Sequence, residues 1–218
     1  MIERRSIKIA PSILSANFSK IGDEINKIQN ADLIHCDVMD GKFVPNITFG
    51  MKMIADIKKI TTIPLDVHLM IDSPENYIEE FIKAGADFLT FHIESTKKIE
   101  QCLDIIGKYN IKRGIAISPD TPVAALDPYI RFCDLVVTMS VYPGFGGQKF
   151  IANSLEKITA LKKIIAQKNC HTLIEVDGGV TFENAKQIIN AGADILVAGN
   201  TVFSHSNPKE IIEKLREI

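Results

Sequence analysis

Cysteine is scarce in this sequence, and its spacing excludes a disulfide-based fold. The chain has four cysteines among 218 residues, and no two of them form a Cys-x-x-Cys pair. Such sparse, irregular spacing does not describe the disulfide framework of a small secreted protein. We expect reduced, mostly buried thiols at Cys36, Cys102, Cys133 and Cys170, in keeping with a cytoplasmic protein.

Long hydrophobic runs and an excess of one charge are missing too. No apolar run approaches the roughly 18–20 residues that cross a bilayer. The start of the chain leads into a short apolar run that contains Lys8 and Pro11, which is not the pattern of a signal peptide. The 25 basic and 27 acidic side chains give a formal net charge of −2, whereas a nucleic-acid surface needs a basic patch. We therefore expect neither a membrane nor a nucleic acid as a partner.

Eight short runs rich in β-branched residues are present, and they predict strands. The runs are 7–11, 33–38, 64–70, 88–93, 113–117, 135–139, 172–176 and 195–198. Stretches with the three- and four-residue spacing of an amphipathic helix lie between them, as at Phe18, Ile21, Ile25 and Ile28.

Signals for the start and end of helices fit this alternation. Ser73, Thr181 and Asn207 are candidate N-caps, and proline follows both Ser73 and Asn207. The tetrapeptide Ala-Gly-Ala-Asp occurs at 84–87 and again at 191–194. We expect the glycine of each copy to end a helix just before the next strand.

A strand followed by a helix, repeated eight times in a chain of this length, predicts one α/β domain. We expect a single-domain TIM (β/α)8 barrel over residues 1–218. The alternative is an open, doubly wound sheet, which usually has fewer strands and a glycine-rich fingerprint after the first. Here the first run ends in Ala10-Pro11-Ser12 instead, and no linker or low-complexity segment marks a domain boundary.

Polar side chains interrupt three of the predicted strands. Residues two apart on a strand share a face. The sets that share a face are His35, Asp37 and Met39 on the second strand, Asp66, His68 and Met70 on the third, and Glu175 and Asp177 on the seventh. Burying such groups unpaired costs several kcal/mol, so their presence needs a reason.

A divalent cation would supply that reason. In a barrel the chemistry sits at the C-terminal ends of the strands, where His35, Asp37, His68 and Asp177 would converge. Imidazole and carboxylate ligands suit Zn, Fe, Mn or Co, so we predict one divalent metal ion on these four residues. Hydrogen-bonded core histidines with helix-capping acids are the alternative.

Three glycine clusters follow the last three strands, at 143–148, 177–179 and 198–200. Glycine lets the backbone approach a ligand, and free N–H groups bind anions. Barrels often bind phosphate in the loops after strands seven and eight. We predict a phosphate site built mainly from amides, because the nearest basic residue is Lys149. Met39, Met70 and Met139, near strand ends, are either core filler or an apolar wall around a reacting carbon.

Several segments closely resemble the ribulose-phosphate 3-epimerase family. They are 10–16 (APSILSA), 35–46 (HCDVMDGKFVPN), 66–70 (DVHLM), 143–148 (PGFGGQ) and 175–179 (EVDGG). The resemblance covers essentially the whole chain. It implies a TIM barrel of the pentose phosphate pathway that interconverts D-ribulose 5-phosphate and D-xylulose 5-phosphate. It also implies a small-molecule sugar phosphate as partner and a homo-oligomer.

The resemblance assigns roles to residues of this chain. It places the metal on His35, Asp37, His68 and Asp177, and the acid–base pair on Asp37 and Asp177. The expected substrate contacts are Ser12, Met39, His68, Met70, Met139, Gly144, Phe145, Gly146, Gly147, Gly178, Gly179, Gly199 and Asn200. Tyr142 and Asn200 depart from the common family pattern, which bears on phosphate geometry and not on the acid–base chemistry.

The expected reaction is epimerisation at C3, next to the C2 ketone. One carboxylate removes the C3 proton and the other returns a proton to the opposite face. Asp37 and Asp177, on strands two and seven, could flank the sugar in this way. The metal would stabilise the negative charge of the enediolate, and the phosphate would hold the sugar through both transfers.

Three alternatives stay open. A D-allulose 6-phosphate 3-epimerase would run the same chemistry on a sugar one carbon longer. Relatives of orotidine-phosphate decarboxylase place a lysine two residues after the strand-two aspartate, where this chain has Met39. A non-catalytic sugar-phosphate-binding barrel has no need for two acids and two histidines. His92 and Glu94 on strand four either support the site or belong to the core, and Asp66 is expected to orient His68 from behind.

Overall fold

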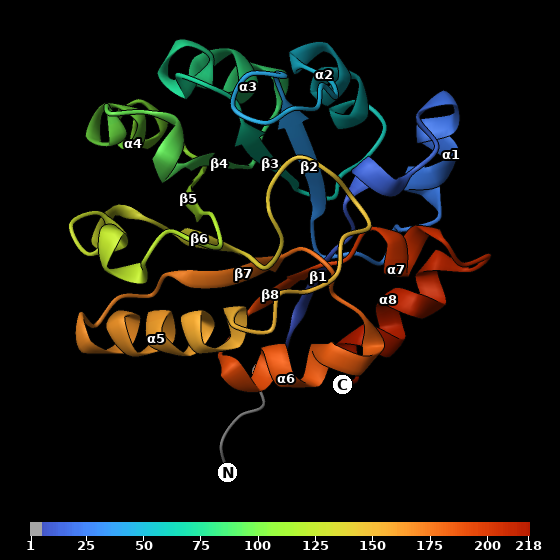
Figure 1. Ribbon diagram of the computed structural model, residues 1–218. Coiled ribbons are helices and arrows are strands. Elements are labelled where there is room, and N and C mark those ends of the chain that lie inside the picture. Colours follow the sequence, from blue (N-terminus) through green and yellow to red (C-terminus); the bar gives the residue numbers. More distant parts are fainter. Residues whose placement is uncertain (1–5) are drawn as a thin grey trace.

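The computed structural model describes residues 6–218 and shows eight parallel strands ringed by helices (Figure 1). The opening residues 1–5, part of the segment in which no export signal was expected, lie outside the described residues. The strands are β1 (Lys8–Ala10), β2 (Ile34–Met39), β3 (Leu65–Met70), β4 (Phe88–His92), β5 (Lys112–Ile117), β6 (Leu135–Met139), β7 (Leu173–Asp177) and β8 (Ile195–Val197). The predicted single-domain TIM barrel is confirmed, and each predicted strand is present with ends shifted by no more than one residue.

Helices connect most consecutive strands. They are α1 (Ile21–Asn26), α2 (Met51–Lys58), α3 (Ile78–Ala84), α4 (Ile99–Gly107), α5 (Ser154–Gln167), α6 (Phe182–Ala191), α7 (Asn200–Phe203) and α8 (Pro208–Arg216). The connection from β5 to β6 departs from the expected repeat, because it consists of the 3-10 turns Val123–Leu126 and Ile130–Phe132. Within residues 6–218, no helix is both long and apolar enough to cross a membrane.

Each of the three predicted N-caps precedes a helical segment, but only Thr181 takes part in a capping hydrogen bond. Asn184 Oδ1 accepts the N–H of Thr181 at 2.8 Å, which caps α6, and Asn207 immediately precedes α8. Ser73 instead has a φ of 52° and donates its hydroxyl to Asp72. The turn that follows is a 3-10 helix, and α3 begins only at Ile78. A residue in the left-handed region has turned away from the extended geometry of an N-cap.

The two Ala-Gly-Ala-Asp segments end helices as expected. Gly85 closes α3 with a φ of 113°, and Gly192 closes α6 with a φ of 125°. Such positive values are open to glycine at little cost. Each glycine therefore reverses the chain into the next strand.

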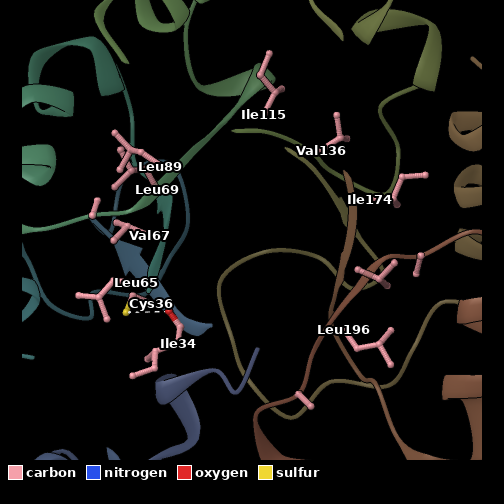
Figure 2. Packing of buried hydrophobic residues seen from close by; sticks show 14 of the residues in the cluster. Ile34, Cys36, Leu65, Val67, Leu69, Leu89, Ile115, Val136, Ile174 and Leu196 are labelled. Carbon is pink, nitrogen blue, oxygen red and sulfur yellow. Dashed lines mark hydrogen bonds between the residues drawn. The ribbon is translucent and has the colours of Figure 1, made fainter. Parts of the chain in front are cut away.

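Strand alternation divides the core into two shells. Side chains on the outer faces of β2–β8, including Ile34, Val67, Leu89, Ile115 and Leu196, pack toward the helices (Figure 2). The inward side chains fill the barrel with a smaller apolar cluster that includes Leu135, Val137 and Ile195. All four cysteines are free, and Cys36, Cys102 and Cys133 are buried, as the sequence predicted.

The register of the strands puts the polar inward residues side by side. Asp37 of β2 is paired with His68 of β3, and Met139 of β6 is paired with Asp177 of β7. The ends of the sheet order, β1 and β2, meet through a bridge between Ser12 and His35. The candidate site residues thus lie on strands that come close together because the barrel closes.

Candidate functional site

Four side chains from three strands converge inside the barrel, near the C-terminal ends of the strands. His35 Nε2 lies 3.3 Å from Asp37 Oδ1 and 3.8 Å from Asp177 Oδ2. His68 Nδ1 lies 3.5 Å from the same Asp37 oxygen and 3.6 Å from the same Asp177 oxygen. The structure therefore brings together the four residues predicted to bind a metal.

The donor atoms of this cluster suit a divalent cation. Their N···O separations match the edge of about 3.4 Å expected for a tetrahedron with ~2.1 Å bonds to nitrogen and oxygen. Among residues 6–218, His35 Nε2 and His68 Nδ1 are buried without a hydrogen-bond partner. An unsatisfied buried nitrogen is costly unless it has a further ligand. The residues present thus fit a metal in both chemistry and spacing.

The charges of the cluster are strongly coupled. Burial opposes protonation of both histidines, but the neighbouring carboxylates outweigh it. They raise the pKa of His35 well above its ordinary value, and they raise the pKa of His68 to about 9. Burial also opposes ionisation of Asp37, yet His35 and His68 hold its pKa below the ordinary value. Without a cation, the site is held together by these acid–histidine attractions.

A second layer of acids lies beneath His35. Asp66 Oδ2 is 2.5 Å from His35 Nδ1, and Glu175 Oε1 is 3.3 Å from the same nitrogen. Burial, followed by the charge of Asp66, raises the pKa of Glu175 to about 8. The expectation that Asp66 orients His68 was wrong. Asp66 supports His35, which stands directly opposite it in the β2–β3 register.

His68 has different neighbours. Its Nε2 atom lies 2.9 Å from Nε2 of His92, whose Nδ1 atom lies 3.0 Å from Glu94 Oε2. His92 is fully buried. Of the pair left undecided by sequence, His92 therefore contacts a candidate metal ligand, and Glu94 contacts His92.

A cavity of about 180 Å³ opens above the four-residue cluster. Asp37 and Asp177 reach its wall, whereas His35 and His68 lie beneath it with fully buried side chains. Every predicted substrate contact except His68 lines this cavity: Ser12, Met39, Met70, Met139, Gly144, Phe145, Gly146, Gly147, Gly178, Gly179, Gly199 and Asn200. A small molecule here would touch both carboxylates and, at the other end, the glycine loops.

Several glycines of these loops lie too close to neighbouring atoms to carry a Cβ atom. A Cβ atom on Gly147 would lie 2.7 Å from Asn200 Nδ2, and one on Gly179 would lie 2.5 Å from the backbone nitrogen of Phe150. Both glycines have positive φ values, of 73° and 63°. In Figure 1 the yellow loop after β6 arches toward the loop after β2, where Asn46 donates to the Gly144 carbonyl at 3.0 Å.

The cavity contains features that the sequence reasoning missed. Ser15 and Gln148 line it, and Gln148 Nε2 donates to the carbonyls of Tyr142 and Phe145 at 2.6 and 2.9 Å. Tyr142 also lines the cavity and donates its hydroxyl to Asp120 at 3.1 Å. None of the lining residues within the described chain is a lysine or arginine. Anion binding here would depend on amides and hydroxyls.

Sequence comparison places these features in a family context. The profile of the ribulose-phosphate 3 epimerase family matches residues 8–203. The ribulose-phosphate 3-epimerase of Bacillus subtilis (strain 168) is 46% identical over 213 residues, which cover 96% of this chain and 98% of the relative. The chloroplastic ribulose-5-phosphate-3-epimerase of Arabidopsis thaliana is 45% identical over 98% of this chain and 77% of its own.

Solved structures with low sequence identity share the fold. The 3-hexulose-6-phosphate synthase of Salmonella typhimurium superposes with a TM-score of 0.74 at 15% identity, over 97% of each chain. A mutant tryptophan synthase α-subunit of Pyrococcus furiosus gives a TM-score of 0.72 at 15% identity, over 97% of this chain and 98% of its own. At such identities the likeness concerns the barrel alone.

Proposed function

The chain belongs to the ribulose-phosphate 3-epimerase family, and from this premise we propose that it interconverts D-ribulose 5-phosphate and D-xylulose 5-phosphate in the pentose phosphate pathway. As a family member it is a carbohydrate epimerase, an enzyme of the isomerase class. One observation carries the proposal for the site: two carboxylates and two histidines converge beneath a cavity rimmed by glycine loops.

The two carboxylates are the proton-transfer groups. Asp37 stands on β2 and Asp177 on β7, so a sugar in the cavity can be approached from two sides. One carboxylate removes the C3 proton and the other, protonated, delivers a proton to the opposite face. The roles exchange in the reverse reaction. The hydroxyl of Ser12 donates to Asp37 Oδ2 at 2.5 Å, which orients this carboxylate and favours its ionised form.

The metal dependence is part of the proposal. His35, Asp37, His68 and Asp177 would hold one divalent cation. When bound, such a cation polarises the oxygens of the ketose and offsets the negative charge of the enediolate. Met39, Met70 and Met139 line the same cavity and exclude water from the reacting carbon.

The glycine loops bind the phosphate at the far end of the substrate. Gly178, Gly179, Gly199 and Asn200 line the cavity, and their backbone N–H groups are the proposed phosphate donors. Binding at a distance from C3 holds the sugar between the two carboxylates while its proton is exchanged.

Proton exchange in D₂O tests the proposal directly. We would incubate metal-loaded protein with ribulose 5-phosphate, and separately with allulose 6-phosphate, and follow C3 by NMR. The expected result is deuterium at C3 with xylulose 5-phosphate appearing much faster than the six-carbon reaction. An Asp87→Asn variant, changed at the opposite end of the barrel, serves as the matched control and should behave as the wild type.

Two other outcomes have definite meanings. Fast exchange with the six-carbon sugar alone would keep the mechanism and change the substrate. No exchange with either sugar, with metal demonstrably bound, would leave a sugar-phosphate-binding barrel and overturn the proposed activity. The homo-oligomer implied by the family resemblance stays a prediction, which sedimentation velocity can check.

A further inference from the structure

A line of polar side chains outside the cavity lining leads from the metal site toward the surface, because His68 and His92 are buried and Glu94 is partly exposed. It runs from His68 to His92 and on to Glu94 through contacts of 2.9 and 3.0 Å. The His68 and His92 rings are stacked, with centroids 5.0 Å apart and planes at 20°. The proposed reaction assigns no task to His92 or Glu94.

Glu94 is anchored firmly at the outer end of this line. Its Oε1 atom accepts the N–H of Ser118 at 2.8 Å and also the hydroxyl of Thr121. Burial opposes its ionisation, but His92 and these donors outweigh burial and bring its pKa to about 2. Glu94 is therefore a carboxylate at neutral pH and can only accept hydrogen bonds.

The segment that holds Glu94 is itself held in place. Lys157 of α5 donates to the carbonyls of Ser118 and Pro119. The loop after β5 is thereby fastened to α5 at the point where it binds Glu94. This gives Glu94 a defined position relative to the barrel.

The positions of the hydrogens follow from this arrangement. Because Glu94 only accepts, the hydrogen between it and His92 belongs to His92 Nδ1. A neutral imidazole that carries its hydrogen on Nδ1 has an acceptor at Nε2, and this atom of the fully buried His92 ring lies 2.9 Å from His68 Nε2. The hydrogen between the two rings then belongs to His68 Nε2. In a neutral His68, the lone pair is left on Nδ1, the atom that faces Asp37 and Asp177.

We propose that His92 and Glu94 are positioning residues that fix His68 in the tautomer whose Nδ1 atom binds the divalent cation. The inference rests on the metal site of the proposed function. Partners that accept a hydrogen bond from a metal-binding histidine typically contribute 10–100-fold to metal affinity. His35 has an equivalent partner in Asp66, at 2.5 Å from its Nδ1 atom. The two histidines are thus oriented through different nitrogens by different acids.

Two substitutions interrupt the line without emptying the core. His92→Phe keeps a ring beside Phe43, whose ring centroid is 4.9 Å away, but removes the acceptor for His68. Glu94→Gln introduces an amide that cannot accept from His92, Ser118 and Thr121 together. His92→Gln offers His68 an acceptor again and serves as the rescue. His171→Phe and Glu80→Gln, at exposed positions, repeat the chemical changes elsewhere as matched controls.

The measurement is Co²⁺ binding to metal-free protein, followed by visible absorption and by competition with a chelator. We expect the dissociation constant to rise 10–100-fold in His92→Phe and Glu94→Gln, with an altered absorption band. His92→Gln should recover most of the affinity, and both controls should match the wild type. In the zinc-loaded wild type, ¹H–¹⁵N correlation spectra should show His68 protonated at Nε2.

The contrary results separate the two claims. Wild-type Co²⁺ affinity and spectrum in both His92→Phe and Glu94→Gln would overturn the positioning role and leave the metal site intact. A zinc-loaded wild type with His68 protonated at Nδ1 would also overturn it. A wild-type protein that binds no Co²⁺ would overturn the metal dependence of the proposed function, and this inference with it.

Discussion

Aspartates stand at both ends of the barrel, in opposite surroundings. At the N-terminal ends of the strands, Asp87 makes a reciprocal pair with Leu65. Its carboxylate accepts the Leu65 N–H at 2.7 Å, and its own N–H donates to the Leu65 carbonyl at 2.9 Å. Lys58 forms an ion pair with the same carboxylate. The hydrogen bonds of this aspartate join β3 to β4.

Three further aspartates at that end of the barrel also accept a backbone N–H group from the preceding strand, an arrangement that we call an aspartate clasp. Asp32, Asp134 and Asp194 accept the N–H groups of Ile9, Arg113 and Ile174 at 2.9, 3.0 and 3.0 Å, and each is paired with a lysine or arginine. Each of these aspartates lies one or two residues before an even-numbered strand and binds the odd-numbered strand before it. Together with Asp87 they form a fourfold repeat of satisfied carboxylates.

The opposite end leaves its polar atoms without such partners. Asp37 and Asp177 face His35 Nε2 and His68 Nδ1, buried nitrogens that make no hydrogen bond in the described chain. The difference shows how to tell a structural aspartate from a chemical one. The deciding property is whether backbone amides and cations already satisfy the carboxylate or whether it shares a cluster that still needs a ligand.

Exchanging carboxylate for amide at each end should give the largest contrast in activity. We expect Asp37→Asn and Asp177→Asn each to lower kcat by about 10²–10⁴-fold, the usual contribution of a general acid or base. Steady-state kinetics with ribulose 5-phosphate measures this loss, with Asp87→Asn as the control. Substantial activity in both single variants would refute the two-carboxylate mechanism.

The next largest contrast is expected on removal of the metal, which should abolish activity at the C-terminal end of the barrel and leave the aspartate clasps at the other end unchanged. We expect dialysis against a chelator to abolish turnover, because the chemistry proposed for the cluster needs the cation. The circular dichroism spectrum should stay unchanged, since the aspartate clasps need no metal. Re-addition of Zn²⁺, Fe²⁺, Mn²⁺ or Co²⁺ one at a time should restore activity and show which cation serves. Full activity in protein shown by elemental analysis to be metal-free would contradict the prediction.

A methyl group in the phosphate loops should have a more local effect. Gly179→Ala places a Cβ atom 2.5 Å from the Phe150 nitrogen at a φ of 63°, so the loop must shift. We expect KM to rise by about tenfold, which corresponds to ~1.4 kcal/mol of lost binding, with a smaller change in kcat. Gly50→Ala, with nothing within 4 Å of its Cβ position, is the matched control. An unchanged KM would remove Gly179 from the phosphate site.

The pH dependence of stability should also be confined to the site. In metal-free protein, the pKa of His68 is raised from about 6.5 to about 9, and that of Glu175 is raised to about 8. A raised pKa stabilises the fold below the unfolded value, and this stabilisation is lost as pH rises through the folded value. We therefore expect the free energy of unfolding of metal-free protein to fall between pH 6.5 and 9, as urea titration would measure. No decline, or a rise, would show that these groups are not coupled as described.

Much of the barrel could be predicted from the sequence, because β-branched runs and helix signals are local. The face of each polar residue could also be predicted, since alternation has a period of two. The sequence could not predict which residues lie side by side on neighbouring strands. Asp66 was expected beside His68, but the register pairs it with His35. Register depends on how the closed barrel staggers its strands, which no single strand encodes.

The clasps were missed although their signal is present. A small residue, an aspartate and two apolar residues lead into every even-numbered strand, at 31–34, 86–89, 133–136 and 193–196. The sequence analysis used Ala-Gly-Ala-Asp only as a mark of a helix end. The aspartate within it has its own partner, the strand 20 or more residues earlier.

The smallest effect is expected from a substitution at the N-terminal end of the barrel alone, at Asp87. Asp87→Ala removes the acceptor for the Leu65 N–H and the partner of Lys58. We expect a loss of about 1–2 kcal/mol in the free energy of unfolding, the usual cost of leaving a backbone donor unpaired. Asp87→Asn should lose less, because its amide oxygen can still accept. The kcat and KM values should not change in either variant. A drop in kcat comparable to that of Asp37→Asn would mean that the two ends are coupled, and that the division of the aspartates into structural and chemical sets is wrong.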